Sequence, residues 1–104
     1  MFTGIIEEVG VIREILTNLD GLEIEIDASL VLSDLKVNDS ISCSGICLTV
    51  TMLEKKSFKV QLVQETLKKT NAKNWVPGYS INLERALLPT SRMGGHIVQV
   101  HIDT

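Results

Sequence analysis

The sequence predicts an all-β fold, a small antiparallel barrel with one or two short helices. About six short runs alternate apolar and polar residues, which is the period of a strand with one buried face, and turn-forming residues separate the runs. The aromatic side chains are two Phe, one Trp and one Tyr, so the core has to be built from Ile, Val and Leu, many of which favour strands. A chain of 104 residues buries one hydrophobic core, which indicates a single domain over residues 1–104.

The first expected element is a β-hairpin over residues 1–27. Apolar residues occupy alternate positions in both arms, namely Ile5, Val9, Val11 and Ile15 in the first arm and Leu22, Ile24 and Ile26 in the second. Asp20 and Gly21 lie between the arms and tolerate the positive φ angles of a tight turn. The period of two therefore predicts two strands joined at residues 18–21.

The middle of the chain predicts one helical turn and three strands. Residues 28–35 are apolar without alternation, which is typical of a short helical turn. The strands are expected over residues 40–43, 46–53 and 58–62, with turns at 38–39, 44–45 and 54–57. In the second of these strands, Cys47, Thr49 and Thr51 share one face and Leu48, Val50 and Met52 share the other.

The last third of the chain predicts a helix followed by two strands. Residues 64–71 form the only stretch with the composition of a helix of some length. Pro77-Gly78 marks a turn before a strand with Tyr79, Ile81 and Leu83 at alternate positions. A loop then runs from Pro89 to Gly94-Gly95, and residues 97–102 form the last alternating run.

Composition excludes several classes of function. A formal net charge of −3 argues against binding to nucleic acid or to an anionic membrane, so small molecules or other protein chains are the expected partners. There is neither an apolar run of membrane-spanning length nor a secretion signal, and we expect a cytoplasmic protein. Cys43 and Cys47 do not form the spacing of a zinc site, and two thiols in that compartment are expected to stay reduced.

Three groups of residues allow both a structural and a functional interpretation. Cys47, Thr49 and Thr51 form an ordinary outward strand face, or else an inward polar face that requires a hydroxyl-rich ligand. Glu65-Thr66 begins a helix, or else the backbone of residues 61–66 holds the imide edge of a planar heterocycle. His96 and His101 have opposite strand parity and cannot share a metal, and a lone His is most often a structural hydrogen-bonding group.

Five sequence blocks, in order along the whole chain, resemble riboflavin synthases. They are Met1-Phe2-Thr3-Gly4-Ile5-Ile6-Glu7-Glu8-Val9-Gly10; Ser44-Gly45-Ile46-Cys47-Leu48-Thr49-Val50-Thr51, similar to "NGxCLTV"; Glu65-Thr66-Leu67 with Thr70-Asn71; Asn82-Leu83-Glu84-Arg85-Ala86; and Gly94-Gly95-His96-Ile97-Val98-Gln99, similar to "GGHxVxGH". One such block is a weak signal, whereas five in the same order are highly specific. The family usually has Gly where this chain has Val100.

The resemblance implies the amino-terminal lumazine-binding barrel of the family's tandem pair, a six-stranded Greek-key barrel. It implies a transferase that dismutates two molecules of 6,7-dimethyl-8-ribityllumazine into riboflavin and a ribitylaminopyrimidine by four-carbon transfer, without a metal or redox cofactor. In the family, three chains assemble, and an active site forms between the first barrel of one chain and the second barrel of a neighbour. For an isolated barrel we expect a homodimer with little activity alone.

The resemblance also implies the site residues of this chain. His101 and Cys47 are the candidates for catalytic contacts. The barrel's own ligand pocket would be lined by Cys47, Leu48 and Thr49 together with Gln61, Leu62, Val63, Gln64, Glu65 and Thr66, with Cys47 and Thr49 facing inward onto ribityl hydroxyls. The ligand of the opposing barrel would be reached by Gly4, Ile5, Ile6, Val100, His101 and Ile102.

Two other functions are compatible with the same fold. One is a non-catalytic lumazine- or riboflavin-binding protein, like the carriers that share this barrel. The other is a plain structural barrel, which the five blocks disfavour. The "GGH" and "CLTV" blocks favour the enzyme family over a carrier.

Overall fold

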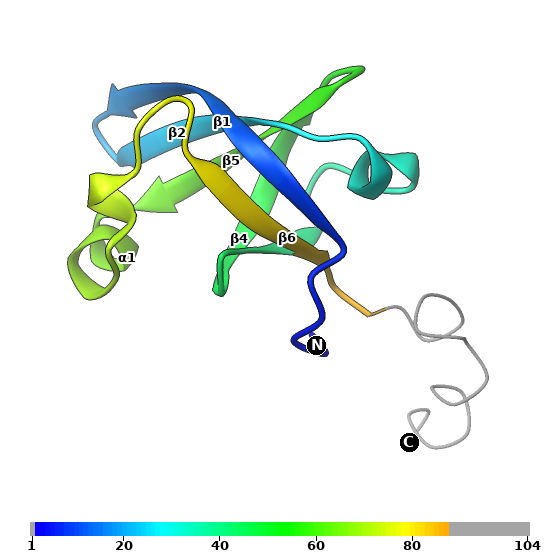
Figure 1. Ribbon diagram of the computed structural model, residues 1–104. Helices are drawn as coiled ribbons and strands as arrows, with labels where there is room; N and C mark the ends of the chain where they lie inside the picture. The colour runs from blue at the N-terminus through cyan, green and yellow to red at the C-terminus, as the bar shows by residue number, and fades with distance from the viewer. Residues whose placement is uncertain (1, 88–104) are drawn as a thin grey trace.

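Six antiparallel strands close into a barrel in the computed structural model, which describes residues 2–87 (Figure 1). Around the barrel the order is β1 (Glu8–Asn18), β2 (Gly21–Asp27), β5 (Ser57–Val63), β4 (Ile46–Leu53), β3 (Ser40–Cys43) and β6 (Ser80–Arg85). Hairpins connect β3, β4 and β5, and β2 lies beside β5, which is the Greek-key arrangement. The predicted all-β antiparallel barrel is therefore confirmed.

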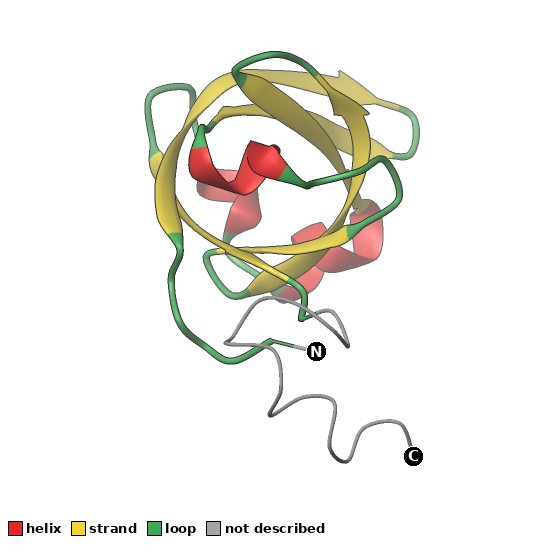
Figure 2. Ribbon diagram, turned by 90° about the vertical axis from the view of Figure 1, so that its right-hand side faces the viewer, coloured by secondary structure: helices red, strands yellow, loops and turns green. Residues whose placement is uncertain are grey.

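Short helical segments cover both ends of the barrel. The 3₁₀ turn η1 (Leu30–Ser33) follows β2, whereas α1 (Gln64–Lys69) and η2 (Ala72–Asn74) follow β5. Because β2 and β5 are antiparallel, these segments lie at opposite ends, as the view along the barrel shows (Figure 2). The helical turn expected within residues 28–35 is confirmed, and the helix expected over 64–71 ends at Lys69.

The helical segments and the strands enclose an aliphatic core. Its fully buried members come from every strand and from both ends, and include Val31 from η1 and Ala72 from η2. Trp75 follows η2 and is 6% exposed at the same end. No helix within residues 2–87 has the length and hydropathy needed to cross a membrane.

The inner face of β1 differs from the sequence prediction. Val9 and Val11 are exposed, whereas Ile12 is buried. A register shift in the β1–β2 pairing between Ile12 and Glu14 inserts an extra residue, after which Ile15 packs against the core. An inserted residue moves the following side chains to the opposite face, so a single period of two does not describe this strand.

A second register shift divides β4 in the same way. Leu48 and Val50 are buried, but the shift between Val50 and Met52 leaves Met52 43% exposed. Cys47 and Thr49 are exposed on the outer face. The interpretation of this polar face as outward is therefore correct, and the inward one is wrong.

Candidate functional site

A row of polar side chains crosses the outer face of four adjacent strands. In the barrel register, Thr49 of β4 pairs with Ser40 of β3 and with Gln61 of β5, and Gln61 pairs with Glu23 of β2. We call Ser40, Thr49, Gln61 and Glu23 the outer row. Directly opposed side chains in a sheet lie about 4.5–5.5 Å apart at Cβ, so one ligand can contact several members of the row.

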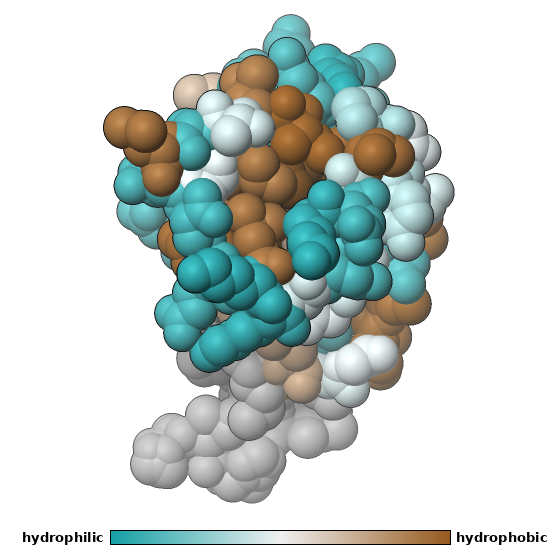
Figure 3. Space-filling model, turned by 90° about the vertical axis from the view of Figure 1, so that its left-hand side faces the viewer, coloured by the Kyte–Doolittle hydropathy of each residue, from teal (hydrophilic) through white to brown (hydrophobic). Residues whose placement is uncertain are grey.

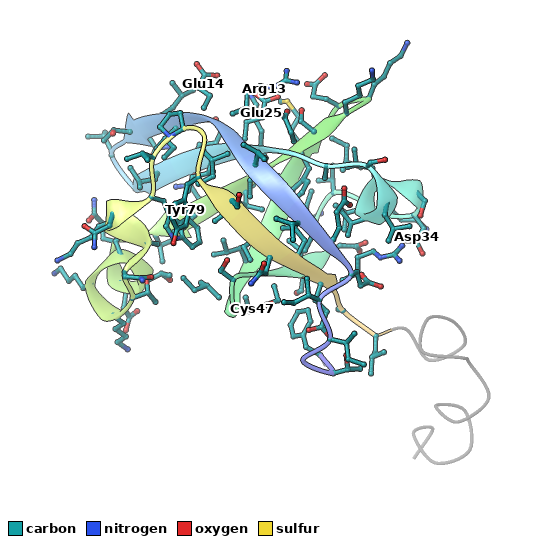
Figure 4. All side chains as sticks on the ribbon, viewed as in Figure 1. Arg13, Glu14, Glu25, Asp34, Cys47 and Tyr79 are labelled. Carbon is teal, nitrogen blue, oxygen red and sulfur yellow. The ribbon has the colours of Figure 1, made fainter. Side chains whose placement is uncertain are left out.

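Cys47 continues this surface toward the α1 end of the barrel. It pairs with Ser42 of β3 and lies near the start of β4, away from Arg13 and Glu25 (Figure 4). Val63, the last residue of β5, is 48% exposed at the same end, where α1 begins. The face seen from the side on which α1 lies in Figure 1 shows apolar surface between hydrophilic flanks (Figure 3). The surface thus combines hydroxyl, amide and thiol groups with exposed apolar area.

The start of α1 provides backbone donors beside Val63. The first N–H groups of a helix have no acceptor within it, and Val63 at the N-cap position makes no side-chain cap hydrogen bond. Glu65 and Thr66 lie inside the first turn of α1, as expected for residues at the start of a helix. The Glu65 carboxylate accepts a hydrogen bond from Lys69 Nζ at 3.0 Å.

The structure corrects two of the predicted side-chain orientations. Cys47 and Thr49 do not face the barrel interior. The alternate residues of the strand, Leu48 and Val50, point inward and fill it. Leu48 is 5% exposed and Leu62 is fully buried, so each of these two can offer a ligand only its backbone. A ligand of the predicted residues would therefore lie on the outside of the barrel.

The two cysteines differ in chemical character. Both thiols are free, but Cys43 lies in the core and Cys47 on the outer face. Burial raises the pKa of the Cys43 thiol to about 12, and the neighbouring Cys47 adds to the shift. Cys43 is therefore an unreactive core residue, and Cys47 is the thiol available at the candidate site.

The predicted residues Gly4, Ile5 and Ile6 lie in a second place, in the segment that precedes β1. We call residues 3–7 the N-terminal strap. The strap lies beside the β3–β4 turn across a hollow of about 220 Å³, whose lining includes Gly4, Ile6 and Ser42. Ser42 is also the strand partner of Cys47, so the strap borders the outer-row surface.

The end of the strap is fixed by a charged cluster. The guanidinium of Arg85 donates to both oxygens of Glu7, at 2.9 Å from Nε and 3.1 Å from Nη2, and to Asp34 at 2.6 Å. The hydrogen bond to Glu7 is the main cause of a raised Arg85 pKa. Glu8, the next residue, accepts hydrogen bonds from the backbone N–H groups of Ser29, just before η1, and of Val31, within η1.

A larger hollow of about 500 Å³ lies at the β4–β5 hairpin and includes none of the predicted site residues. Its lining mixes both charges, from Arg13, Glu25, Glu54, Lys55, Lys56 and Ser57. Arg13 is already paired with Asp27 at 2.7 Å. This arrangement is typical of a solvated charged surface.

The remaining predicted residues, Gly94, Gly95, His96, Val100, His101 and Ile102, lie outside the described residues. Within the described part of the chain, no group of three or more His, Cys, Asp or Glu side chains is arranged to hold a metal ion.

Comparison with known proteins identifies the family. The family model described as lumazine binding domain matches residues 3–86. The chain belongs to the lumazine binding domain family. The fold and both candidate places lie within the matched region of this lumazine binding domain.

Curated riboflavin synthases are similar to the whole chain. The riboflavin synthase of Schizosaccharomyces pombe is 43% identical over 105 residues, which cover 100% of this chain and 50% of that protein. The Photobacterium phosphoreum and Bacillus subtilis riboflavin synthases are 46% and 43% identical, covering 99% of this chain and 48% of each relative. The resemblance to riboflavin synthase is confirmed, and the chain spans about half the length of these relatives.

Sequence reasoning missed two members of the outer row, Ser40 and Glu23. Neither lies in a family block, and no local pattern marks them. Their place beside Thr49 and Gln61 depends on the pairing of strands that are distant in the chain, which a linear pattern does not reveal.

Proposed function

We propose that this chain is a lumazine-binding barrel of riboflavin synthase type, which binds one 6,7-dimethyl-8-ribityllumazine or one riboflavin on its outer face. The outer row supports this proposal most directly, because Thr49 and its neighbours form a polar surface within the region that matches the lumazine binding domain family. Ribityl hydroxyls match the hydroxyl and amide groups of Ser40, Thr49 and Gln61. The planar ring would lie toward Cys47, Val63 and the start of α1, where its imide edge faces backbone donors.

The polar groups of the outer row still have hydrogen-bonding capacity for a ligand. Among the described residues, the Gln61 amide makes only long contacts, with the Asn18 amide at 3.4 and 3.5 Å and with the Leu62 carbonyl oxygen at 3.4 Å. The exposed Thr49 hydroxyl is both a donor and an acceptor. A ligand that replaces water here recovers these hydrogen bonds, and it gains apolar contact at Val63.

A matched pair of threonine variants tests the site. Thr49→Val removes a hydroxyl while keeping the side-chain shape, and leaves a ligand hydroxyl unpaired at a cost of about 1–3 kcal/mol. Titration followed by riboflavin fluorescence should then show a Kd weaker by roughly 5- to 150-fold. The control is Thr51→Val, the same change two positions along the strand, where the hydroxyl donates to the Lys59 carbonyl at 3.2 Å. Equal affinity of Thr49→Val and Thr51→Val would show that the outer row does not hold the ligand.

For activity, we propose that this barrel supplies one half of a riboflavin synthase site. Dismutation requires two lumazines face to face, and holding two reactants in reacting geometry supplies up to about 7–11 kcal/mol of rate enhancement. A single barrel with one ligand face provides only one of the two positions. We therefore expect slow or no formation of riboflavin from lumazine by the 104-residue chain alone.

Extending the chain tests this proposal and the carrier alternative together. The isolated chain is assayed beside a version extended by a family-type second barrel, each with and without Val100→Gly. Strong turnover by the short chain would contradict the two-barrel account. Turnover only in the extended versions would support it, and tight binding without turnover in every version would favour a non-catalytic carrier.

A further inference from the structure

Three carboxylates alternate along the outer face of β2, and two of them have partners within the barrel. Glu25 Oε2 accepts a hydrogen bond from the Ser57 hydroxyl at 2.6 Å, and Arg13 Nη1 lies 3.9 Å from it. Asp27 Oδ1 accepts from Arg13 Nε at 2.7 Å. The third, Glu23, forms no hydrogen bond or ion pair with any described residue. Glu23 therefore differs from its two neighbours on the same strand.

The strands on either side of Glu23 offer its carboxylate no donor. Glu23 is half-buried, and on β1 it pairs with the apolar Leu16. On β5 it pairs with Gln61, whose Nε2 is directed to Asn18 Oδ1 at 3.5 Å and to the Leu62 carbonyl oxygen at 3.4 Å. A carboxylate that is partly withdrawn from water gains most from a donor, and hydrogen bonds to a charged oxygen are the stronger class. A bound ligand can bring that donor.

Glu23 forms one end of the outer row, on the side away from β3. Neighbouring strands lie about 4.7–4.9 Å apart, so Glu23 is one strand spacing from Gln61 and two from Thr49. One alternate position closer to α1, Val63 of β5 pairs with Gly21 of β2. Because Gly21 has no side chain, a flexible chain that starts beside Val63 reaches Glu23 without crossing a side chain of β2. A ligand with its ring at Val63 can therefore place the end of its ribityl chain at Glu23.

We propose that Glu23 is a specificity-determining residue, which selects a ribityl chain with a free terminal hydroxyl and excludes the 5′-phosphate ester of the same ligand. The inference rests on the proposed function, which places the ribityl chain along the outer row. A terminal hydroxyl donates a hydrogen bond to the Glu23 carboxylate. A phosphate monoester instead brings a charge of about −1.5 to −2 at neutral pH and mainly acceptor oxygens. The same carboxylate then repels the ligand that it would otherwise bind.

The other charges near this end of the row do not cancel the repulsion. Glu25 lies two positions along β2 on the same face. Lys59 of β5 pairs in the register with Glu25 and is therefore diagonal to Glu23, at a Cβ spacing of about 7–8 Å. The Arg13 guanidinium is held by Asp27. One ammonium group thus stands against two carboxylates, and the end of the row is negative.

The test measures the Kd of riboflavin and of riboflavin 5′-phosphate by flavin fluorescence at low ionic strength. Wild type should bind riboflavin at least about tenfold more tightly than the phosphate, since two like charges at this range interact strongly at a partly buried surface. Glu23→Gln should reduce this ratio to about threefold or less. The control is Glu54→Gln, which makes the same change of net charge at the exposed β4–β5 hairpin and should keep the wild-type ratio. Added salt should reduce the wild-type ratio and leave that of Glu23→Gln nearly unchanged.

A second variant, Glu23→Asp, keeps the charge and should keep the preference for riboflavin. Glu23→Gln loses no contact within the described protein, so both variants should melt within about 2 °C of wild type. The role of Glu23 would be overturned by equal ratios in Glu23→Gln and Glu54→Gln, or by a wild type that binds both flavins equally. Riboflavin binding without discrimination thus overturns this inference alone. A wild type that binds neither flavin overturns the proposed function, and this inference with it.

Discussion

The ion pair between Glu7 and Arg85 allows a quantitative test of how the strap is joined to the barrel. Arg85 has an 11% exposed side chain and Glu7 a 23% exposed one, so neither charge is fully solvated. Glu7 accepts from the guanidinium through both oxygens and also from the backbone N–H of Arg85 at 2.8 Å. Replacing Glu7 by Gln keeps the shape but removes the charge and one acceptor.

The expected cost of Glu7→Gln follows from these contacts. One oxygen continues to accept, and the Asp34 carboxylate still offsets the Arg85 charge, so the loss is less than that of a fully broken buried pair. We expect about 2–3 kcal/mol of stability to be lost, between the value of a charged hydrogen bond and that of a broken buried pair. For a domain of this size the melting temperature should fall by roughly 10–15 °C.

Thermal unfolding followed by circular dichroism at neutral pH measures this difference. The exposed Glu14→Gln variant carries the same chemical change away from the cluster and should melt within about 2 °C of wild type. Arg85→Lys provides a second check, since it keeps the charge but loses the planar fork that reaches both carboxylates. The reasoning would be refuted if the Glu7→Gln and Glu14→Gln variants had the same melting temperature.

Two further predictions concern a tight turn and the cysteines. Gly21→Ala should destabilise the barrel by more than about 2 kcal/mol in urea unfolding, because an added Cβ would lie 1.9 Å from the Leu62 carbonyl oxygen and φ is +144° there. If this variant had the same free energy of unfolding as wild type in urea, the hairpin would be able to shift without loss of stability. Iodoacetamide at pH 8 should modify Cys47 and leave Cys43 unmodified in the folded protein, because burial and a pKa of about 12 keep Cys43 protonated. Mass mapping that finds Cys43 modified first would contradict its placement in the core.

Local signals in the sequence were sufficient to predict the elements of the fold. Asp20-Gly21 and Pro77-Gly78 lie at turns in the structure, and the strand expected at 40–43 is β3 with those bounds. These features depend on residues that are close in the chain, such as glycines that tolerate positive φ. The irregular positions were not predictable in this way, because the register shifts after Ile12 and Val50 belong to strand pairs and not to one strand.

For the candidate site, the sequence did not predict which way the side chains point. The resemblance selected Cys47, Thr49 and Gln61, and the structure brings their strands together on one face. The predicted inward orientation of Cys47 and Thr49 was wrong. Leu48 and Val50 pack in the core, and because successive side chains of a strand point to opposite faces, the side chains between them point outward. The buried partner of the strap, Glu84, was part of a recognised block, but its contact with Thr3 spans 81 positions and has no local signal.

The filled interior of the barrel determines how much of a ligand this fold can enclose. Phe58 and the aliphatic side chains around it are fully buried, and helical segments cover both ends, so no flat molecule enters between the strands. A ring resting on the convex outer wall contacts protein on one side only, and its other side stays in water. That uncovered side is where a second reactant can stack, and excluding water from the pair requires a second wall. A barrel with a filled interior can therefore enclose a planar substrate completely only where a second protein surface packs against its outer wall.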